Sequence, residues 1–294
     1  MGYQLWTSPL TGYRRRGTRL VELHSVLGSQ ITARAIFEPL QSCPADAPAL
    51  EMYQMLEQRD FDVAGVRTKR DGPVIGFVRR SRLKGGTVQD HVGSLSADNW
   101  IQETLPLAVL MERLKDREFV FVRIEPDGAG IITRADLNKP PVRVYLFGLI
   151  SLLEMHLSYW VREDYPGDTW HPSLKPDRMR ETEKVQAERR RRKQDLELID
   201  CLQFCDKRDL ILAREHLCNE LGLGSKGKAT TNLKDAEVLR NTLAHSQYDL
   251  VPDDSWKELL QLIEWMEALV RKSDDSVEQR ARQRAKQVGI AALW

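Results

Sequence analysis

The sequence predicts an α+β protein in which a small α/β module, built in two halves, is followed by an all-helical bundle. Between residues 30 and 138, a pattern of helix, strand, turn and strand occurs twice, with the copies about 55 residues apart. Pro140 and Pro141 then interrupt the chain, and the apolar spacing beyond them is helical. The 294 residues are enough for two separate cores.

The α/β module is predicted from apolar helix faces that each precede two strands. In the first copy, Ala49, Met52 and Leu56 share one face of a helix, and in the second Leu107, Met111 and Leu114 do so. The predicted strands lie at residues 31–37, 63–66 and 74–78 in the first copy, and at 119–124 and 131–133 in the second.

The helical part is divided by polar and glycine-containing connections. Helices are predicted at 144–161, from 178 to about 221 with a break near Asp206, at 232–246 and at 256–272. The predicted organisation is a tail or edge strand at 1–28, the α/β module at 29–139, the bundle at 140–273 and a charged helix or tail at 274–294.

Residues 144–161 are apolar and about long enough to span a bilayer. Glu154 and His156 lie inside this stretch, where a membrane would make them costly, so a core helix is favoured. Near the beginning, Trp6 and Arg14-Arg15-Arg16 stand where a signal peptide has its apolar segment. We therefore expect a cytoplasmic protein without membrane contact.

The net charge of +1 argues against a broadly basic nucleic-acid-binding surface, so any RNA contact must be local. None of the four cysteines forms a C-x-x-C pair. Cys201 and Cys205, four apart on a predicted helix, are either part of a metal site or small buried apolar residues. The second alternative is favoured, and no metal site is predicted.

The candidate catalytic residues lie on the predicted helix at 232–246. Ala236, Leu239 and Leu243 fall on one face of it, whereas Asn241 and His245 line up on the opposite face with Arg240 beside them. Arg240 and His245 diverge by about 140°, but a long arginine can reach the same cleft. Imidazole can move the proton in RNA cleavage, guanidinium can stabilise the phosphorane, and the amide can position a phosphate oxygen. The alternative is an ordinary solvated helix face.

The segment Leu239–His245, LRNTLAH, resembles the HEPN superfamily motif of arginine, four to six residues, then histidine. The resemblance covers roughly residues 141–272. It implies a helical bundle that forms a homodimer, with two motifs making one metal-independent RNA-cleaving site that leaves 2′,3′-cyclic phosphates. Many relatives are toxins or defence effectors that a neutralising partner or a ligand holds in check, and some are inactive.

A basic run, Arg189-Arg190-Arg191-Arg192, lies on the preceding predicted helix. It either follows an RNA backbone or forms a solvated helix face balanced by nearby carboxylates such as Glu188 and Asp195. The residues alone leave both alternatives open.

The end of the second copy, with Gly130, Thr133 and Asp136, resembles the CBS-domain signature, and CBS domains occur in tandem pairs. This resemblance covers about residues 28–140. It implies that Thr133 contacts phosphate and Asp136 holds the ribose of an adenine nucleotide; a plain helix cap is the alternative. The first copy departs from the pattern because Arg79 and Arg82 occupy the corresponding positions, although those arginines could meet additional phosphates.

Together the patterns predict a HEPN-type endoribonuclease that is regulated by an adenine nucleotide and needs no catalytic cofactor. The alternative from another class is a non-catalytic nucleotide-sensing dimer that binds RNA or a partner protein. A further alternative is a toxin neutralised by modification near the motif.

Overall fold

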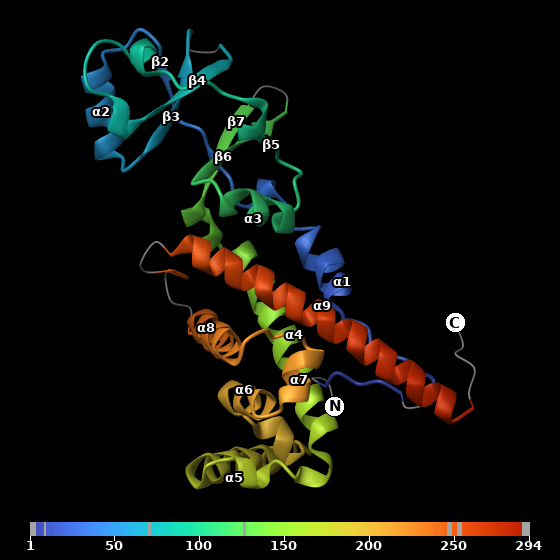
Figure 1. Cartoon of the computed structure of the whole chain (residues 1–294). Coiled ribbons are helices and arrows are strands. Elements are labelled where there is room, and N and C mark those ends of the chain that lie inside the picture. The colour runs from blue at the N-terminus through green and yellow to red at the C-terminus, as the bar shows by residue number, and fades with distance from the viewer. Residues whose placement is uncertain are drawn as a thin grey trace. The chain divides into compact units, whose positions relative to one another are not determined.

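The chain folds into two compact units, one of which is inserted into the other along the sequence. The computed structural model describes residues 4–8, 10–69, 72–125, 128–245, 249–251 and 255–289. Gly28–Pro141 form an α/β unit, and the flanking segments, Met1–Leu27 and Val142–Trp294, together form a helical unit (Figure 1). The first segment is therefore not the separate tail or edge strand that the sequence predicts.

The α/β unit repeats one topology in two halves, as predicted. In each half the first strand is parallel to the second, and the second is antiparallel to the third. A short strand, β1 (Glu38–Pro39), adds to the second sheet beside β7. The elements are β2 (Ser42–Pro44), α2 (Ala49–Gln58), β3 (Val63–Arg67), β4 (Val74–Arg79) and η3 (Arg80–Arg82), then β5 (Trp100–Gln102), α3 (Leu107–Lys115), β6 (Phe119–Ile124), β7 (Gly128–Thr133) and η6 (Arg134–Asn138).

Two apolar clusters hold this unit together. In the first half, Met52 and Leu56 of α2 pack with Val66 and Val78 from the sheet. An aromatic cluster joins the halves, because Phe77 of β4 lies 5.8 Å from Phe119 and 5.4 Å from Phe121 of β6 between ring centroids. Burial of such aromatic pairs stabilises the shared core beyond its area alone.

The strand predicted at residues 31–37 is wrong. The segment forms a 3-10 turn, η2 (Ala33–Ala35), and the strand begins only at Glu38. The backbone N–H groups of Ala33 and Arg34 donate to the carbonyls of Leu105 and Glu103 at 2.9 and 2.8 Å. These partners come from the second half of the unit, so local apolar alternation could not reveal them. Two further 3-10 turns are η4 (Val88–His91) and η5 (Ala97–Asn99).

The helical unit is built around one long apolar helix, α4 (Pro140–Asp164), which begins with the two prolines. It passes the length and composition test for a membrane span, yet 61% of its most apolar window is buried inside the protein. Leu146, Leu149, Leu153 and Trp160 are fully enclosed, as expected for a core helix. Around it lie α1 (Leu20–Leu23), η1 (a π-helix, His24–Gly28), η7 (Pro166–Asp168), η8 (His171–Ser173), α5 (Pro176–Arg191), η9 (Leu198–Cys201), α6 (Phe204–Leu212), α7 (Glu215–Glu220), α8 (Lys226–Ala244) and α9 (Trp256–Gln287).

Two helix predictions for this unit are wrong in extent. The region from 178 to 221 is divided among α5, η9, α6 and α7. Lys193 adopts a left-handed φ of 58° and ends α5, and capping boxes at Glu197 and Gln203 begin η9 and α6. In contrast, the helix predicted at 256–272 continues to Gln287 as α9. Most of the described residues after 273 therefore belong to the second half of α9. Val277, Ala281 and Ala285 are buried at a spacing of four, which extends the apolar stripe of the helix.

Candidate functional site

The predicted catalytic residues lie at the C-terminal end of α8. Ala236 and Leu239 are buried and Leu243 is half-buried, which confirms the predicted core face. Arg240, Asn241 and His245 are exposed on the rest of the helix surface. The buried residues fix the helix in the bundle and leave the three polar side chains facing solvent.

The structure brings Arg240 and Asn241 together but leaves His245 apart. The Arg240 guanidinium donates to Oδ1 of Asn241 at 3.2 Å, and its Nε lies 3.9 Å from Oε2 of Glu154 on α4. The other oxygen of Glu154 accepts from Nζ of buried Lys207 at 2.8 Å. His245 is the C-cap residue, and between described residues no hydrogen bond or ion pair joins it to Arg240. One chain thus presents an oriented arginine and an exposed imidazole.

The predicted nucleotide residues form a capping box at the start of η6. Oδ2 of Asp136 accepts from the backbone N–H of Thr133 at 2.7 Å and from its hydroxyl at 3.1 Å. Oδ1 of Asp136 lies 2.9 Å from Nζ of Lys139, which also pairs with Glu38. Both carboxylate oxygens therefore already have partners inside the unit, so this geometry matches the helix-cap alternative.

The arginines at the corresponding positions of the first half behave differently from each other. Arg79 pairs with Glu118 at 2.5 Å and lies over the Phe119 ring at 4.8 Å, whereas Arg82 is exposed. The Arg79 side chain is therefore engaged with the second half of the same unit.

Arg189, Arg190 and Arg191 occupy the last turn of α5, and Arg192 is its C-cap. All four side chains are exposed, and Arg192 pairs with Glu188 at 2.5 Å. Cations at this end of a helix are favoured by its dipole, which is sufficient to explain part of the run. Cys201 is buried and Cys205 half-buried, and among the described residues no three His, Cys, Asp or Glu side chains are placed to hold a metal ion.

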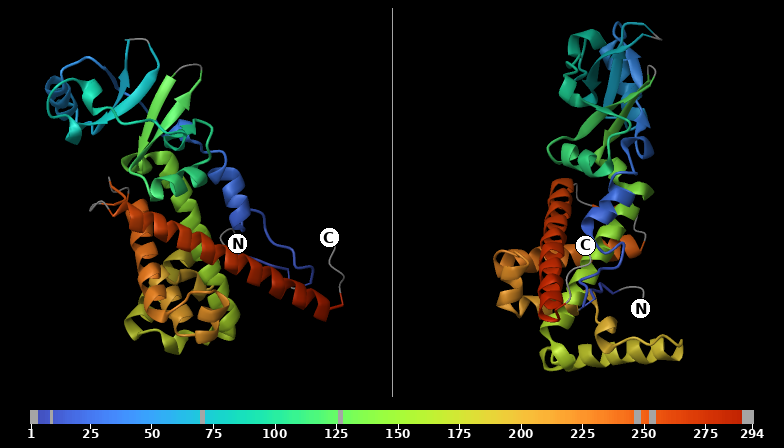
Figure 2. Two further views of the ribbon diagram at one scale, coloured as in Figure 1. Left: turned by 45° about the horizontal axis from the view of Figure 1, so that its top comes forward. Right: turned by 90° about the vertical axis from the view of Figure 1, so that its right-hand side faces the viewer.

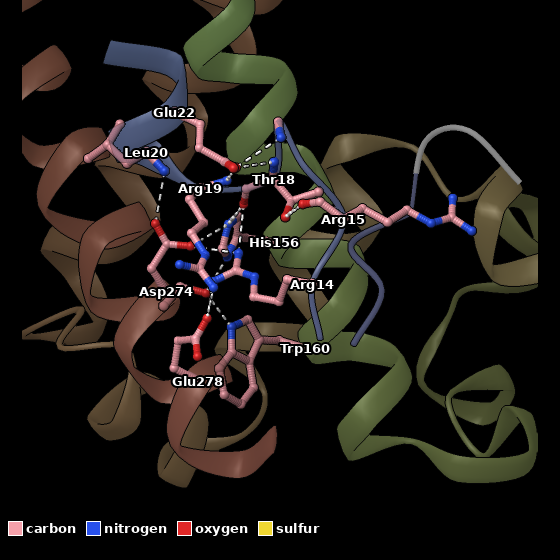
Figure 3. Close-up of polar contacts among 12 residues, drawn as sticks. Arg14, Arg15, Thr18, Arg19, Leu20, Glu22, His156, Trp160, Asp274 and Glu278 are labelled. Carbon is pink, nitrogen blue, oxygen red and sulfur yellow. Dashed lines mark hydrogen bonds and ion pairs between the residues drawn. The ribbon is translucent and has the colours of Figure 1, made fainter. Parts of the chain in front are cut away.

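Sequence reasoning missed a buried polar network where α4 and α9 meet the N-terminal segment (Figure 3). The Arg14 side chain is 1% exposed, and its Nη2 donates to Oδ1 of Asp274 and to the carbonyl of Thr18, both at 2.7 Å. Burial raises the pKa of Asp274 above its ordinary value, although Arg14 and the backbone N–H of Leu20 oppose the rise. The signal in the sequence was His156 within an apolar helix, because a buried polar side chain needs a buried partner.

The same network places His156 between Ser273 and Asp274. Nδ1 of His156 lies 2.6 Å from Oγ of Ser273, and its Nε2 lies 3.5 Å from Oδ1 of Asp274. Nε2 also faces the carbonyl of Thr18 at 3.4 Å, so both of its neighbours are acceptors and Nε2 carries the imidazole proton. Nδ1 then accepts from the Ser273 hydroxyl, whose Oγ accepts from the indole N–H of Trp160 at 2.6 Å. Because His156 and Ser273 are each only 1% exposed, no substrate reaches them and the trio is structural.

Burial, with Arg14 beside it, lowers the pKa of His156 from 6.5 to about 3. The imidazole is therefore neutral at physiological pH. This agrees with the donor and acceptor roles assigned to its two nitrogens.

No family model and no curated protein matches the sequence. Among solved structures, part of the chain is similar to the CBS domain of a bacterial CNNM/CorC family Mg²⁺ transporter in complex with ATP, with 20% identity over 41% of this chain and 93% of that one and a TM-score of 0.34. An uncharacterised conserved protein of Pyrococcus horikoshii matches with 16% identity over 37% of this chain and 90% of that chain, at a TM-score of 0.33. A CBS domain protein of unknown function from Thermoplasma acidophilum matches with 12% identity over 40% and 75%, at a TM-score of 0.32.

Proposed function

We propose that the chain is a metal-independent endoribonuclease of the HEPN type whose reacting groups are Arg240, Asn241 and His245. The observation that carries this proposal is their placement on α8: the helix buries Ala236 and Leu239 while all three motif side chains face solvent. Arg240 is further oriented by Asn241 and faces Glu154.

In the proposed reaction, the RNA 2′-hydroxyl attacks the adjacent phosphorus and the bond to the 5′-oxygen of the next nucleotide breaks. One imidazole takes the 2′ proton, and a second returns a proton to the departing 5′-oxygen. The products then carry a 2′,3′-cyclic phosphate and a 5′-hydroxyl. Arg240 stabilises the additional negative charge on the phosphorane, and Asn241 orients a phosphate oxygen.

The proposed scheme uses two imidazoles, and each motif supplies one, His245. We therefore propose that two copies of the chain form a homodimer through their α8 surfaces and share one site. Val238 lies two residues before Arg240 on α8, and 63% of its surface is exposed. Such a dimer would cover this apolar side chain.

We further propose that an adenine nucleotide regulates cleavage by binding near Thr133 and Asp136. The support is the signature at the end of β7 within a unit built from two matching halves. Oδ1 of Asp136, which has Lys139 as its partner at 2.9 Å, can accept one further hydrogen bond, and we propose that a ribose hydroxyl donates it. ATP is the probe of choice, and a thermal shift in wild type that is absent in Asp136→Ala would support the site; equal shifts in both proteins would refute it.

The test of catalysis is cleavage of a fluorescent single-stranded RNA by purified protein in EDTA, with product ends identified by mass spectrometry. His245→Ala and Arg240→Ala should each abolish cleavage without changing the melting temperature. His216→Ala is the matched control, since it removes another histidine of the helical unit that is 60% exposed. Equal rates in wild type and His245→Ala would refute the catalytic role.

A second candidate function is RNA binding without cleavage. It is favoured by one observation: Glu154 already faces the Arg240 guanidinium, while no contact orients His245 toward it among the described residues. The same RNA assay separates the two, because a binding protein would shift the RNA in a gel and leave it intact.

A further inference from the structure

The N-terminal strap, residues 4–8 and 10–27, belongs to the helical unit although the whole α/β unit separates it in sequence from the rest of that unit. Both covalent connections of the α/β unit, after Leu27 and after Pro141, therefore lead to the same helical unit. In both views of Figure 2 the blue N-terminal segment runs alongside the red helix α9. The α/β unit is thus held at its two ends rather than at one.

The first anchor of the strap is Asp274 on α9. Its two oxygens accept from the Arg14 guanidinium at 2.7 Å and from the backbone N–H of Leu20 at 2.9 Å (Figure 3). One turn further along α9, Glu278 pairs with Arg19. Two carboxylates four residues apart on one helix therefore hold both ends of the segment from Arg14 to Leu20.

The second anchor lies next to the connection into the α/β unit. His24 opens the π-helix η1, and its Nε2 lies 3.3 Å from Oε1 of Glu267 on α9 and 3.2 Å from the hydroxyl of Tyr145 on α4. The Tyr145 hydroxyl also donates to Glu267. A Cβ on Gly148 would lie 2.9 Å from Cδ1 of Leu23, so this glycine allows the strap to pack closely on α4. A π-helix is rare and often marks a functional position.

The first anchor is not fully satisfied. Among the described residues, Nε and Nη1 of Arg14 are buried without a hydrogen-bond partner, and Nη1 lies 3.9 Å from the nearest oxygen of Glu278. Release of the strap would separate the buried Arg14 guanidinium from the Asp274 carboxylate. Because these hydrogen bonds are missing, the docked strap is less stable than it would be with a fully hydrogen-bonded Arg14.

We propose that the strap is a releasable second tether that reports the state of the α/β unit to the helical unit. While the α/β unit is folded, the separation of its two ends is fixed and the strap docks at small entropic cost. When that unit loosens, the strap must close a long flexible loop to dock, and docking weakens. Ligand binding in the α/β unit then acts on the helical unit through the strap as well as through α4; this second part rests on the proposed function.

The direct test needs neither ligand nor RNA: it measures hydrogen exchange of the amides at 18–27. Phe121→Ala opens the core of the α/β unit and should speed exchange in the strap by about fivefold or more, because strap docking depends on that unit. Val109→Ala, at an exposed position of the same unit, is the control. Val120→Ala is the milder substitute if Phe121→Ala does not fold. Strap exchange that stays at the Val109→Ala level while exchange in 119–133 rises would overturn the proposal.

A second arm tests the anchor itself. Asp274→Asn and Arg19→Gln should each speed exchange at 18–27, whereas Asp275→Asn, on the neighbouring exposed position of α9, should not. In cleavage assays, Arg19→Gln, which removes the more exposed contact of this anchor, should bring the ratio of rates with and without ATP towards one, while the rate without ATP is kept. If wild type does not cleave RNA, the proposed function fails and the exchange results still decide on the tether.

Discussion

Two arginine–histidine combinations in the helical unit have opposite surroundings. On α8, Arg240 and His245 are exposed, and within the described part of the chain the partners of Arg240 are the Asn241 amide and a Glu154 carboxylate oxygen 3.9 Å away. Between α4 and α9, Arg14 and His156 are enclosed with Asp274, Ser273 and Trp160. The same two residue types therefore have different roles in the two places. Only the exposed pair can contact a substrate, and only the enclosed pair can stabilise the core.

The largest effect on stability is expected from a substitution at the enclosed pair. Asp274→Ala leaves the Arg14 charge buried without its partner, and such losses cost about 3–5 kcal/mol. Urea unfolding followed by tryptophan fluorescence measures this, since Trp160 and Trp170 are fully buried in the helical unit. A cost below about 1 kcal/mol would show that the network contributes little to stability.

At the exposed pair, Arg240→Lys should affect activity and not stability. Lysine keeps the charge but lacks the planar fork that contacts two phosphate oxygens, so we expect kcat/KM for RNA cleavage to fall about 100-fold. The melting temperature should stay within experimental error of wild type. Unchanged cleavage would mean that Arg240 acts only as a point charge.

The enclosed histidine predicts a pH dependence. Because the pKa of His156 falls from 6.5 to about 3 on folding, the unfolded chain binds the additional proton as pH drops below 6.5. Stability should decrease by about 1.4 kcal/mol per pH unit in that window, or about 2 kcal/mol between pH 6.5 and 5. Asp274, whose pKa burial raises, acts in the opposite direction, so the measurement is the difference between wild type and His156→Gln. Equal pH slopes in the two proteins would contradict the prediction.

Capping boxes of the α/β unit offer a smaller contrast. In each box, the hydroxyl and the backbone N–H of a threonine donate to the same aspartate oxygen. Thr133→Ala and Thr87→Ala each remove the hydroxyl, and each should lower the free energy of unfolding by about 1 kcal/mol. Only Thr133→Ala should also reduce the thermal shift given by ATP. If both variants keep the shift, Thr133 is a cap and nothing more.

The smallest stability effect is expected at the end of α5. Exposed charges contribute little, so Arg191→Gln combined with Arg192→Gln should change stability by less than about 0.5 kcal/mol. If these arginines contact RNA phosphates, the slope of log affinity against log salt should become shallower by about 1.4. An unchanged slope would show that these arginines form a solvated helix face and do not contact RNA phosphates.

Features with local causes were predictable from the sequence. The two α/β halves follow from apolar alternation, and the face of α8 follows from the spacing of Ala236 and Leu239. The breaks after α5 depend on one left-handed residue and on side-chain caps at Glu197 and Gln203, which a window average conceals. The docking of the first segment onto α9 joins Arg14 to a residue 260 positions away, and no local pattern encodes such a pair.

That separation has a consequence for synthesis of the chain. When Arg14 leaves the ribosome, its carboxylate partner is still 260 codons away, which at bacterial and eukaryotic elongation speeds is roughly 13 to 50 seconds of translation. About halfway through that interval the α/β unit has all of its residues and can fold, while the helical unit cannot yet close. Because α9 receives the N-terminal segment, the core of the helical unit is completed only after the residues of α9 have been translated.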